Sequence, residues 1–265
     1  MARMENIMRK VIYCIFLLPL LGGFTLAQAT AFDHSHAPFD KVLQRFLHHG
    51  LVDYAGLKSD PRDLAVYLDQ LAAVSQAEFQ KWTEPQQLAF LINLYNATTL
   101  QLILDHYPTT SIKKIGNVVR GPWDQPIVRL FGETTTLDRV EHKILRKNYA
   151  EPRVHFALVC AALGCPVLRE ETYTAEKLDR QLTDQGRRFL GNAQKNRVDA
   201  KARVVYLSPI FKWFSEDFEK KSGSVLKFVQ LYFPPEAQAA LEQGSFKIRY
   251  TDYDWSLNDT AAARK

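Results

Sequence analysis

The segment EPQQLAFLINLYNATTLQLILDHYP, residues 84–108, constrains the fold more than any other part of the chain. Its apolar residues recur at helical intervals but occupy nearly every side, and a helix of that kind must be buried all round. We therefore predict one long helix through the centre of the domain. Asn93 and Asn96 lie three residues apart on this helix and share a face. Because buried amides need hydrogen-bond partners, they either fasten backbone or support catalysis, and both roles stay open.

Shorter elements are predicted on both sides of that helix. Apolar spacing predicts helices at about residues 39–47, 61–71, 136–146, 174–190 and 225–232, and strands at Val154–Cys160, 202–208 and 245–255. Phe211, Phe214 and Phe218 also align on one helical face, so the FKWF segment is interpreted as core. Together these patterns predict one α+β domain, with a helical N-terminal half packed on a small, mostly antiparallel sheet.

The first 29 residues have the pattern of a secretory signal peptide. Basic residues precede an apolar run, Val11–Leu26, and the small residues AQA follow it. The run is shorter than the roughly 20 residues that a membrane-spanning helix needs, so cleavage is favoured over an uncleaved anchor. We predict a cleaved signal at residues 1–29, a periplasmic or secreted location, no stable membrane insertion after cleavage, and a single domain at residues 30–265.

Charge and motifs exclude several classes of partner. Cleavage removes three basic residues and one acidic residue from a net charge of +5, which leaves about +3 on 236 residues. No block of like charges with interleaved aromatics is present, so nucleic acid is not a predicted partner. The chain has no glycine-rich phosphate loop, and its HSH and HH pairs lack further metal ligands at suitable spacing. We predict no cofactor and no metal, but a small-molecule or peptide substrate; the oligomeric state stays open.

The segment HFALVCAALGCPVLRE, residues 155–170, places His155, Cys160 and Cys165 within eleven positions. In a straight strand, residues five apart lie about 16 Å apart on opposite faces, so His155 and Cys160 cannot pair unless the chain bends. A disulfide between Cys160 and Cys165 is geometrically possible, and export favours it. The alternatives are a buried inert thiol and a catalytic thiol at Cys160. A disulfide there could also be the resting state of a redox-active pair.

Glu141 and His142 form a second candidate group. On a helical wheel Glu141 falls between Leu137 and Leu145, inside the apolar stripe, where a carboxylate is costly without a partner. His142 lies on the flank of that face and can reach a cleft. The pattern indicates either a general base with acidic support, or a structural pair of Glu141 with an arginine such as Arg153.

Seven segments in one order resemble the domain-of-unknown-function family 547: GLVDYAGL, AFLINLYNATTLQLIL, LDRVEHKILR, RVHFALVCAALGCPVL, YTAEKLD, LSPIFKWFSEDF and YDWSLN. They span residues 39–258, the predicted core of the domain. The resemblance implies a pattern centred on Asn93, Asn96, Glu141, His142, His155 and Cys160. It also implies that Cys165 is a looser position, where relatives can carry Ser, and this favours a thiol function for Cys160 over a disulfide.

The chain departs from that family pattern at Ala161 and Ala162, where relatives often carry Gly and Ser. A Cys–His–Asn or Cys–His–acid set is similar to those of thiol hydrolases of the papain and transglutaminase kind, and a fold of that kind is one option. Those enzymes usually place the cysteine at a helix N-terminus, whereas Cys160 is predicted at the end of a strand.

The leading functional prediction is an exported thiol-dependent hydrolase or acyltransferase. It would act on a peptide or small thiol-peptide substrate through a covalent acyl intermediate. The predicted catalytic residues are Cys160 as nucleophile and His142 as base, supported by Glu141, Asn93 and Asn96. The predicted supporting or binding residues are His155, Arg153 and Asp254, of which Asp254 could equally form a turn. The alternatives are a non-catalytic binding or scaffold module with a structural Cys160–Cys165 disulfide, and a thiol–disulfide redox protein.

Overall fold

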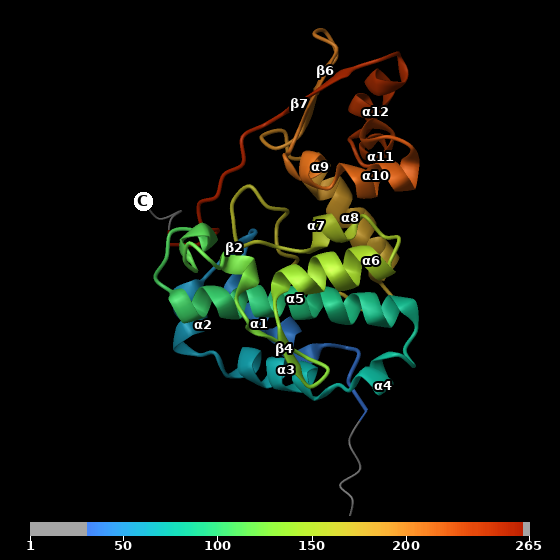
Figure 1. Ribbon diagram of the computed structural model, residues 1–265. Helices are drawn as coiled ribbons and strands as arrows, with labels where there is room; N and C mark the ends of the chain where they lie inside the picture. The colour runs from blue at the N-terminus through green and yellow to red at the C-terminus, as the bar shows by residue number, and fades with distance from the viewer. Residues whose placement is uncertain (1–30, 262–265) are drawn as a thin grey trace, which may run out of the picture. The chain divides into compact units, whose positions relative to one another are not determined.

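The structure, a computed structural model, describes residues 31–261, and Figure 1 labels its elements. From Phe32 onward these residues belong to one compact unit. The first half is helical, as predicted, with α1 at Ala37–Phe46, α2 at Tyr54–Ser59, α3 at Arg62–Ala73, α4 at Gln76–Phe79 and α5 at Glu84–His106. The α+β class predicted from the sequence is confirmed.

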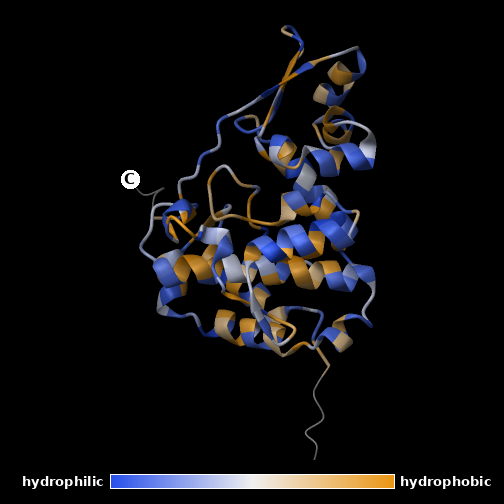
Figure 2. Cartoon of the chain, viewed as in Figure 1, coloured by the Kyte–Doolittle hydropathy of each residue, from blue (hydrophilic) through white to orange (hydrophobic). Residues whose placement is uncertain are grey.

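Helix α5 is the centre of the larger hydrophobic core. Every residue from Leu88 to Leu100 is buried, and the helix lies between α3 on one side and the Arg139–Leu145 turn on the other (Figure 1). Its start is capped, because the side chain of Gln86 accepts a hydrogen bond from the backbone N–H of Thr83 at 2.9 Å. Figure 2 shows hydrophobic residues recurring along α5 and α3. The predicted central helix is therefore confirmed, with its end at His106.

The second half contains shorter helices, several of which surround a smaller core rich in phenylalanine. These are the π-helical segment η3 at Arg139–Leu145, α6 at Arg146–Asn148, α7 at Val154–Ala157, α8 at Leu178–Leu190, α9 at Ile210–Trp213, α10 at Ser215–Ser222, α11 at Val225–Gln230 and α12 at Pro235–Glu242. Two 3-10 turns, η1 at Ile112–Lys114 and η2 at Pro122–Asp124, follow α5. The predicted helices at 136–146, 174–190 and 225–232 correspond to η3, α8 and α11.

The strands are short and form three small sheets within residues 31–261. They are β1 at Leu47–His48, β2 at Leu51–Val52, β3 at Val128–Leu130, β4 at Glu133–Thr135, β5 at Arg197–Asp199, β6 at Val204–Leu207 and β7 at Lys247–Tyr250. The first two pairs are antiparallel hairpins. In the third sheet β6 pairs antiparallel with β5 and parallel with β7, with Val205 opposite Ile248.

The strand predicted at Val154–Cys160 is wrong. Residues Val154–Ala157 form helix α7, and only residues 158–160 are extended. The alternation of apolar and β-branched residues in this stretch reflects burial on all sides, which a short helix and a buried strand both require. The separation of His155 and Cys160 derived from a straight strand therefore does not apply.

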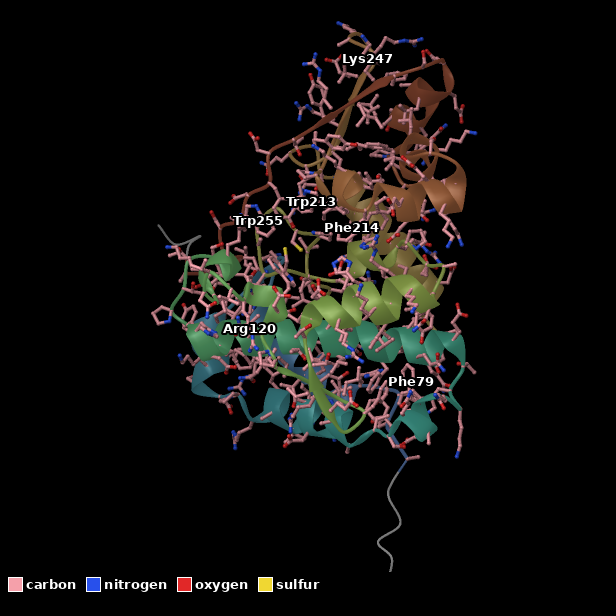
Figure 3. The ribbon with its side chains drawn as sticks, in the orientation of Figure 1. Phe79, Arg120, Trp213, Phe214, Lys247 and Trp255 are labelled. Carbon is pink, nitrogen blue, oxygen red and sulfur yellow. The ribbon has the colours of Figure 1, made fainter. Side chains whose placement is uncertain are left out.

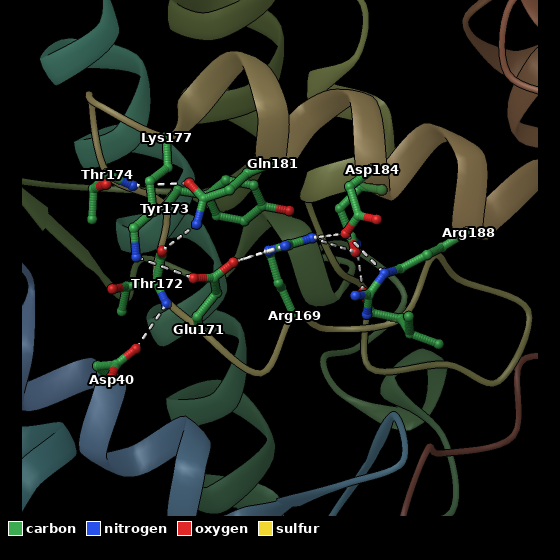
Figure 4. A network of polar contacts seen from close by, with 12 residues as sticks. Asp40, Arg169, Glu171, Thr172, Tyr173, Thr174, Lys177, Gln181, Asp184 and Arg188 are labelled. Atoms are coloured by element: carbon green, nitrogen blue, oxygen red, sulfur yellow. Dashed lines mark hydrogen bonds and ion pairs between the residues drawn. The ribbon is translucent and has the colours of Figure 1, made fainter.

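An ionic network fixes the loop that leads from the cysteines to α8 (Figure 4). The guanidinium of Arg169 forms ion pairs with Glu171 at 2.7 Å and with Asp184 of α8 at 2.5 Å. On the same helix, Gln181 donates a hydrogen bond to the carbonyl of Thr172 at 2.8 Å. The loop is thereby attached to α8 along its length.

The prediction for the N-terminal segment lies outside the described residues. Cleavage of residues 1–29 and export therefore stay predictions. Among the helices that residues 31–261 form, none combines the length and the hydropathy needed to cross a bilayer.

Candidate functional site

A cavity of about 410 Å³ brings together segments that are distant in the sequence. Volumes of about 300–1,000 Å³ are typical of small-molecule sites. It is lined by Tyr95, Trp123, Asp124, Asp138, Glu141, His142, His155, Leu158, Val159, Cys160, Cys165, Ile210, Trp213, Phe214, Tyr253 and Trp255. Five residues singled out in the sequence share this one cavity: Glu141, His142, His155, Cys160 and Cys165.

Asn96 of α5 holds the backbone that leads to Cys160. Its amide nitrogen donates to the carbonyl of Ala157 at 3.0 Å, and its amide oxygen accepts from the N–H of Val159 at 3.0 Å. Both bonds are buried, so the extended segment after α7 is attached to the most buried helix of the domain. Asn96 is thus a positioning residue, and it fastens backbone rather than supplying an oxyanion donor.

The two cysteines are free and lie in contact at one end of the cavity. The N–H of Cys160 donates to the sulfur of Cys165 at 3.0 Å, and the sulfur of Cys160 lies 3.1 Å from the hydroxyl of Tyr253. The hydrogen bond with Cys165, together with burial, raises the pKa of Cys160 well above its usual value. Burial alone would raise the pKa of Cys165, but the thiol and backbone N–H of Cys160 lower it. One thiol of the pair therefore ionises before the other.

The C-terminal segment holds the cysteine loop and positions Tyr253. Ala162 forms a bridge with Leu257, and the N–H of Gly164 donates to the carbonyl of Asp254 at 2.8 Å. A Cβ atom at Gly164 would lie 2.8 Å from the backbone nitrogen of Asp254, so this close approach requires glycine. Ala161, next to Cys160, has a positive φ of 55°, which is strained for alanine.

Glu141 is a buried carboxyl group with one hydrogen-bond donor. The hydroxyl of Tyr95 donates to its Oε2 at 3.1 Å, and the side chain is 11% exposed. Burial raises the pKa of Glu141 to about 7, although the bond from Tyr95 opposes this. The carboxyl group can therefore gain or lose a proton near neutral pH. Its predicted pairing with Arg153 is wrong, because Arg153 instead binds Glu151 at 2.6 Å.

Behind Glu141, His155 is oriented by Asp217 of α10. Nε2 of His155 donates to Oδ2 of Asp217 at 2.7 Å, while its Nδ1 lies 3.7 Å from Oε1 of Glu141. Burial lowers the pKa of His155, although Asp217 opposes this effect. Burial would raise the pKa of Asp217, but hydrogen bonds from His155 and Arg146 hold it well below its usual value. His155 is thus a neutral imidazole oriented by an ionised carboxylate.

His142 lies at the edge of the cavity and is about one-third exposed. Its Nδ1 accepts a hydrogen bond from Arg146 at 2.7 Å, and its Nε2 lies 3.6 Å from Oδ1 of Asp138. Burial lowers the pKa of His142. Within residues 31–261, no hydrogen bond joins either cysteine sulfur to an imidazole; the recorded hydroxyl contact of Cys160 is Tyr253. The assignment of His142 as base for Cys160 stays a prediction.

Aromatic side chains form a large part of the cavity lining. Trp213 stacks on Trp255 with 5.8 Å between ring centroids, and Tyr253 lies 4.9 Å from Trp213. Trp123 contacts Trp255 edge-on at 5.9 Å, and Phe214 stacks on the ring of His155 at 3.9 Å. Figure 3 labels Trp213, Phe214 and Trp255, which lie close together where the C-terminal segment passes α9. The FKWF segment is therefore core in part, since its tryptophan belongs to the cavity wall.

The other predicted site residues lie outside this lining. Asn93 donates to the carbonyl of Tyr173 at 2.7 Å and accepts from its N–H at 3.0 Å, so it fastens backbone. Arg153 also binds Asp179 of α8 at 2.8 Å, which makes it a structural residue. Asp254 accepts from the N–H of Ser256 at 2.8 Å and forms a turn. Among residues 31–261 no three His, Cys, Asp or Glu side chains form a potential metal site.

Sequence reasoning missed several residues of the site. Asp217 follows two polar residues at the start of a helix, where an acidic side chain is typical of an exposed first turn. Trp213 is predicted as core, and Tyr253 and Trp255 fall in the strand predicted at 245–255, whereas strand β7 ends at Tyr250. A usable signal was the concentration of aromatic residues in two segments, 211–218 and 250–255, which both also carry acidic residues.

The fold and the site define the class: an α+β domain with a cavity that holds two thiols, a carboxyl group of near-neutral pKa and an aromatic wall. Residues 79–190 match the family described as "Protein of unknown function, DUF547", so this part of the chain is similar to that family. The matched segment includes Glu141, His142, His155 and both cysteines. No curated protein and no solved structure matches the chain.

Proposed function

We propose that the protein is a thiol-dependent hydrolase or acyltransferase that acts on a peptide or small thiol-peptide substrate. The observation that carries this proposal is that Cys160 and Glu141, whose pKa is about 7, line one cavity. A nucleophile and a group able to transfer protons near neutral pH are the two requirements of acyl transfer.

In the proposed reaction, the sulfur of Cys160 attacks the substrate carbonyl carbon. Its proton passes to the thiolate of Cys165, which the N–H of Cys160 stabilises. Glu141 in its acid form then protonates the leaving group, the carbon–leaving-group bond breaks, and an acyl-thioester on Cys160 results. Attack by water or an acceptor, with Glu141 as base, releases the product, and Cys160 regains its proton from Cys165.

The dyad of His155 and Asp217 supports Glu141 in this proposal. Nδ1 of His155 lies 3.7 Å from Glu141, and Asp217 holds the other ring nitrogen. A neutral imidazole beside the carboxyl group leaves its proton available, whereas a cation there would favour the carboxylate. His142 is the alternative proton carrier; its Nε2 lies 3.6 Å from Oδ1 of Asp138, and its Nδ1 could accept a proton only after losing the hydrogen bond from Arg146.

Trapping the acyl intermediate tests the proposal. We expect p-nitrophenyl acetate to acetylate Cys160, as located by mass spectrometry of peptides, and Cys160→Ser to abolish this. Cys165→Ser retains the thiol of Cys160 but removes the proposed proton acceptor, so it should slow acetylation without abolishing it. Acetylation at lysines alone, or equal rates in Cys160→Ser and wild type, would contradict the proposal.

A pH profile separates the two proton carriers. If Glu141 is the acid and base, the deacetylation rate should change around pH 7 in wild type and lose that dependence in Glu141→Gln. His142→Gln should retain it. The reverse result would assign the role to His142, as predicted from the sequence.

Contact between the two cysteines supports a second candidate, a thiol–disulfide redox protein. A disulfide substrate would be reduced to two thiols while Cys160 and Cys165 form a disulfide. Equilibration with glutathione buffers, followed by mass spectrometry, tests this candidate. A disulfide that resists reduction would instead indicate a structural disulfide in a non-catalytic binding or scaffold module.

Export is part of the proposal. The sequence pattern of residues 1–29 supports it. An N-terminal sequence of the mature protein that starts near residue 30 is expected, and one that starts at Met1 would contradict it.

A further inference from the structure

We propose that the cavity binds its substrate through an alkylammonium group, held between tryptophan faces and carboxylates. This inference names the substrate class for the site proposed above and rests on that function for its relevance to catalysis. Its binding test, however, is independent of any reaction. Three features of the cavity carry it: charge, aromatic wall and an unpaired histidine nitrogen.

The charged residues that line the cavity are acidic. Asp124, Asp138 and Glu141 belong to the lining, whereas no Lys or Arg does. Oδ2 of Asp124 accepts only a backbone N–H, that of Gly121 at 3.3 Å, and Asp138 lies 3.6 Å from His142. Within residues 31–261 neither Asp124 nor Asp138 forms an ion pair with Lys or Arg, so a cation can approach them.

The cations nearest the cavity are already engaged. Arg146 forms an ion pair with Asp217 at 2.6 Å. Lys195 donates to the carbonyl of Cys165 at 2.5 Å, and burial lowers its pKa. Lys113 lies over the ring of Trp255. These groups leave the carboxylates at the cavity available to a ligand.

The aromatic wall suits an organic cation. The ammonium of Lys113 lies 4.9 Å from the ring centroid of Trp255, so one ring of the wall already binds an alkylammonium. Trp123 and Trp213 flank that ring and, within the described part of the chain, have no Lys or Arg over them. Tryptophan is the aromatic side chain that binds cations best, and carboxylates beside it add to the attraction.

His155 supplies an independent indication of a ligand. Its Nδ1 is buried, belongs to a residue of the cavity lining and has no hydrogen-bond partner. Because Nε2 donates to Asp217, Nδ1 carries a lone pair and needs a donor. Buried polar atoms without partners are rare, so this one needs a donor: the acid form of Glu141, whose Oε1 lies 3.7 Å away, or an N–H of a ligand in the cavity.

Binding to the inert Cys160→Ser variant tests the inference. The probes are n-butylammonium, n-butanol and butyrate, which share a chain but differ in charge, and tryptophan fluorescence reports binding. We expect n-butylammonium to bind about tenfold more tightly than n-butanol, and butyrate to bind most weakly. Equal affinity for ammonium and alcohol, or a preference for butyrate, would overturn the inference.

Variants locate the binding. Asp138→Asn and Asp124→Asn, made separately in case one fails to fold, should each reduce the ammonium preference about threefold or more. The exposed Asp63→Asn is the matched control and should leave it unchanged. An unchanged preference in both cavity variants would refute the site. If n-butylammonium binds preferentially but Cys160 is never acetylated in wild type, the proposed function fails while this inference stands. If Cys160 is acetylated but the cavity shows no preference for ammonium, the proposed function stands and this inference fails.

Discussion

Replacing Glu141 by glutamine should make the stability of the protein less dependent on pH. Burial raises the pKa of Glu141 in the folded protein from 4.5 to about 7. Since a raised pKa means that folding favours the protonated form, this contribution to stability is fully present below pH 4.5 and is lost as the pH rises to 7. The difference between the two pKa values corresponds to about 3 kcal/mol.

Glutamine resembles the protonated carboxyl group in shape and keeps an oxygen that accepts from Tyr95. At pH 5 Glu141→Gln should therefore match wild type within about 1 kcal/mol. Between pH 5 and pH 8.5 the variant should gain about 2–3 kcal/mol of unfolding free energy relative to wild type. Urea unfolding of both proteins at the two pH values measures this change. Subtracting the unfolding free energy of wild type from that of the variant cancels the titration of the groups that both proteins share.

The exposed Glu242 on α12 provides a control. Glu242→Gln should change the unfolding free energy by less than about 0.5 kcal/mol at both pH values. The opposite result is that the stability of Glu141→Gln relative to wild type falls between pH 5 and pH 8.5. The carboxylate would then be stabilised in the folded protein. The reasoning from burial would then be refuted, and so would the role of Glu141 as an acid near neutral pH.

Five further substitutions, in three groups, test the support of the site. Asn96→Ala and Asn93→Ala each remove two buried hydrogen bonds and should cost about 2–4 kcal/mol in urea unfolding, but only Asn96→Ala should alter the alkylation rate of the cavity thiol. Ala161→Gly should leave thermal stability unchanged because it relieves a positive φ, whereas Ala162→Gly should cost about 1 kcal/mol. Asp217→Asn should cost about 2 kcal/mol at pH 7, and the deficit should shrink below pH 3.8, because a depressed pKa stabilises only above the unfolded value.

Elements with a strong periodic pattern were predictable from the sequence. The central helix was expected at residues 84–108 and ends at His106, because Pro108 cannot continue it. The burial of Glu141 also followed from its place in an apolar stripe. These features depend on local spacing and on the cost of burying a polar group, and both are visible in one sequence.

Features that depend on contacts between distant segments were not predictable. The backbone before Cys160 takes its conformation from Asn96, more than sixty residues earlier, so local alternation suggested a strand instead. Asp217 is likewise part of the site only because α10 packs against His155. The resemblance to a family indicated that Cys160 and His155 belong to one pattern of site residues. It could not show which side chains contact each of them in the fold.

The π-helical winding of η3 makes the site sensitive to chain length. The N–H of Arg146 donates to the carbonyl of Glu141, five residues back, whereas in an α-helix the acceptor lies four residues back. The π-helical turn therefore contains one residue more than an α-helical turn. Shortening it by a single residue would restore α-helical bonding and rotate the preceding side chains by about 100°. Deletion of one residue between 142 and 145 would thus be expected to turn Glu141 away from the thiols while leaving a foldable helix.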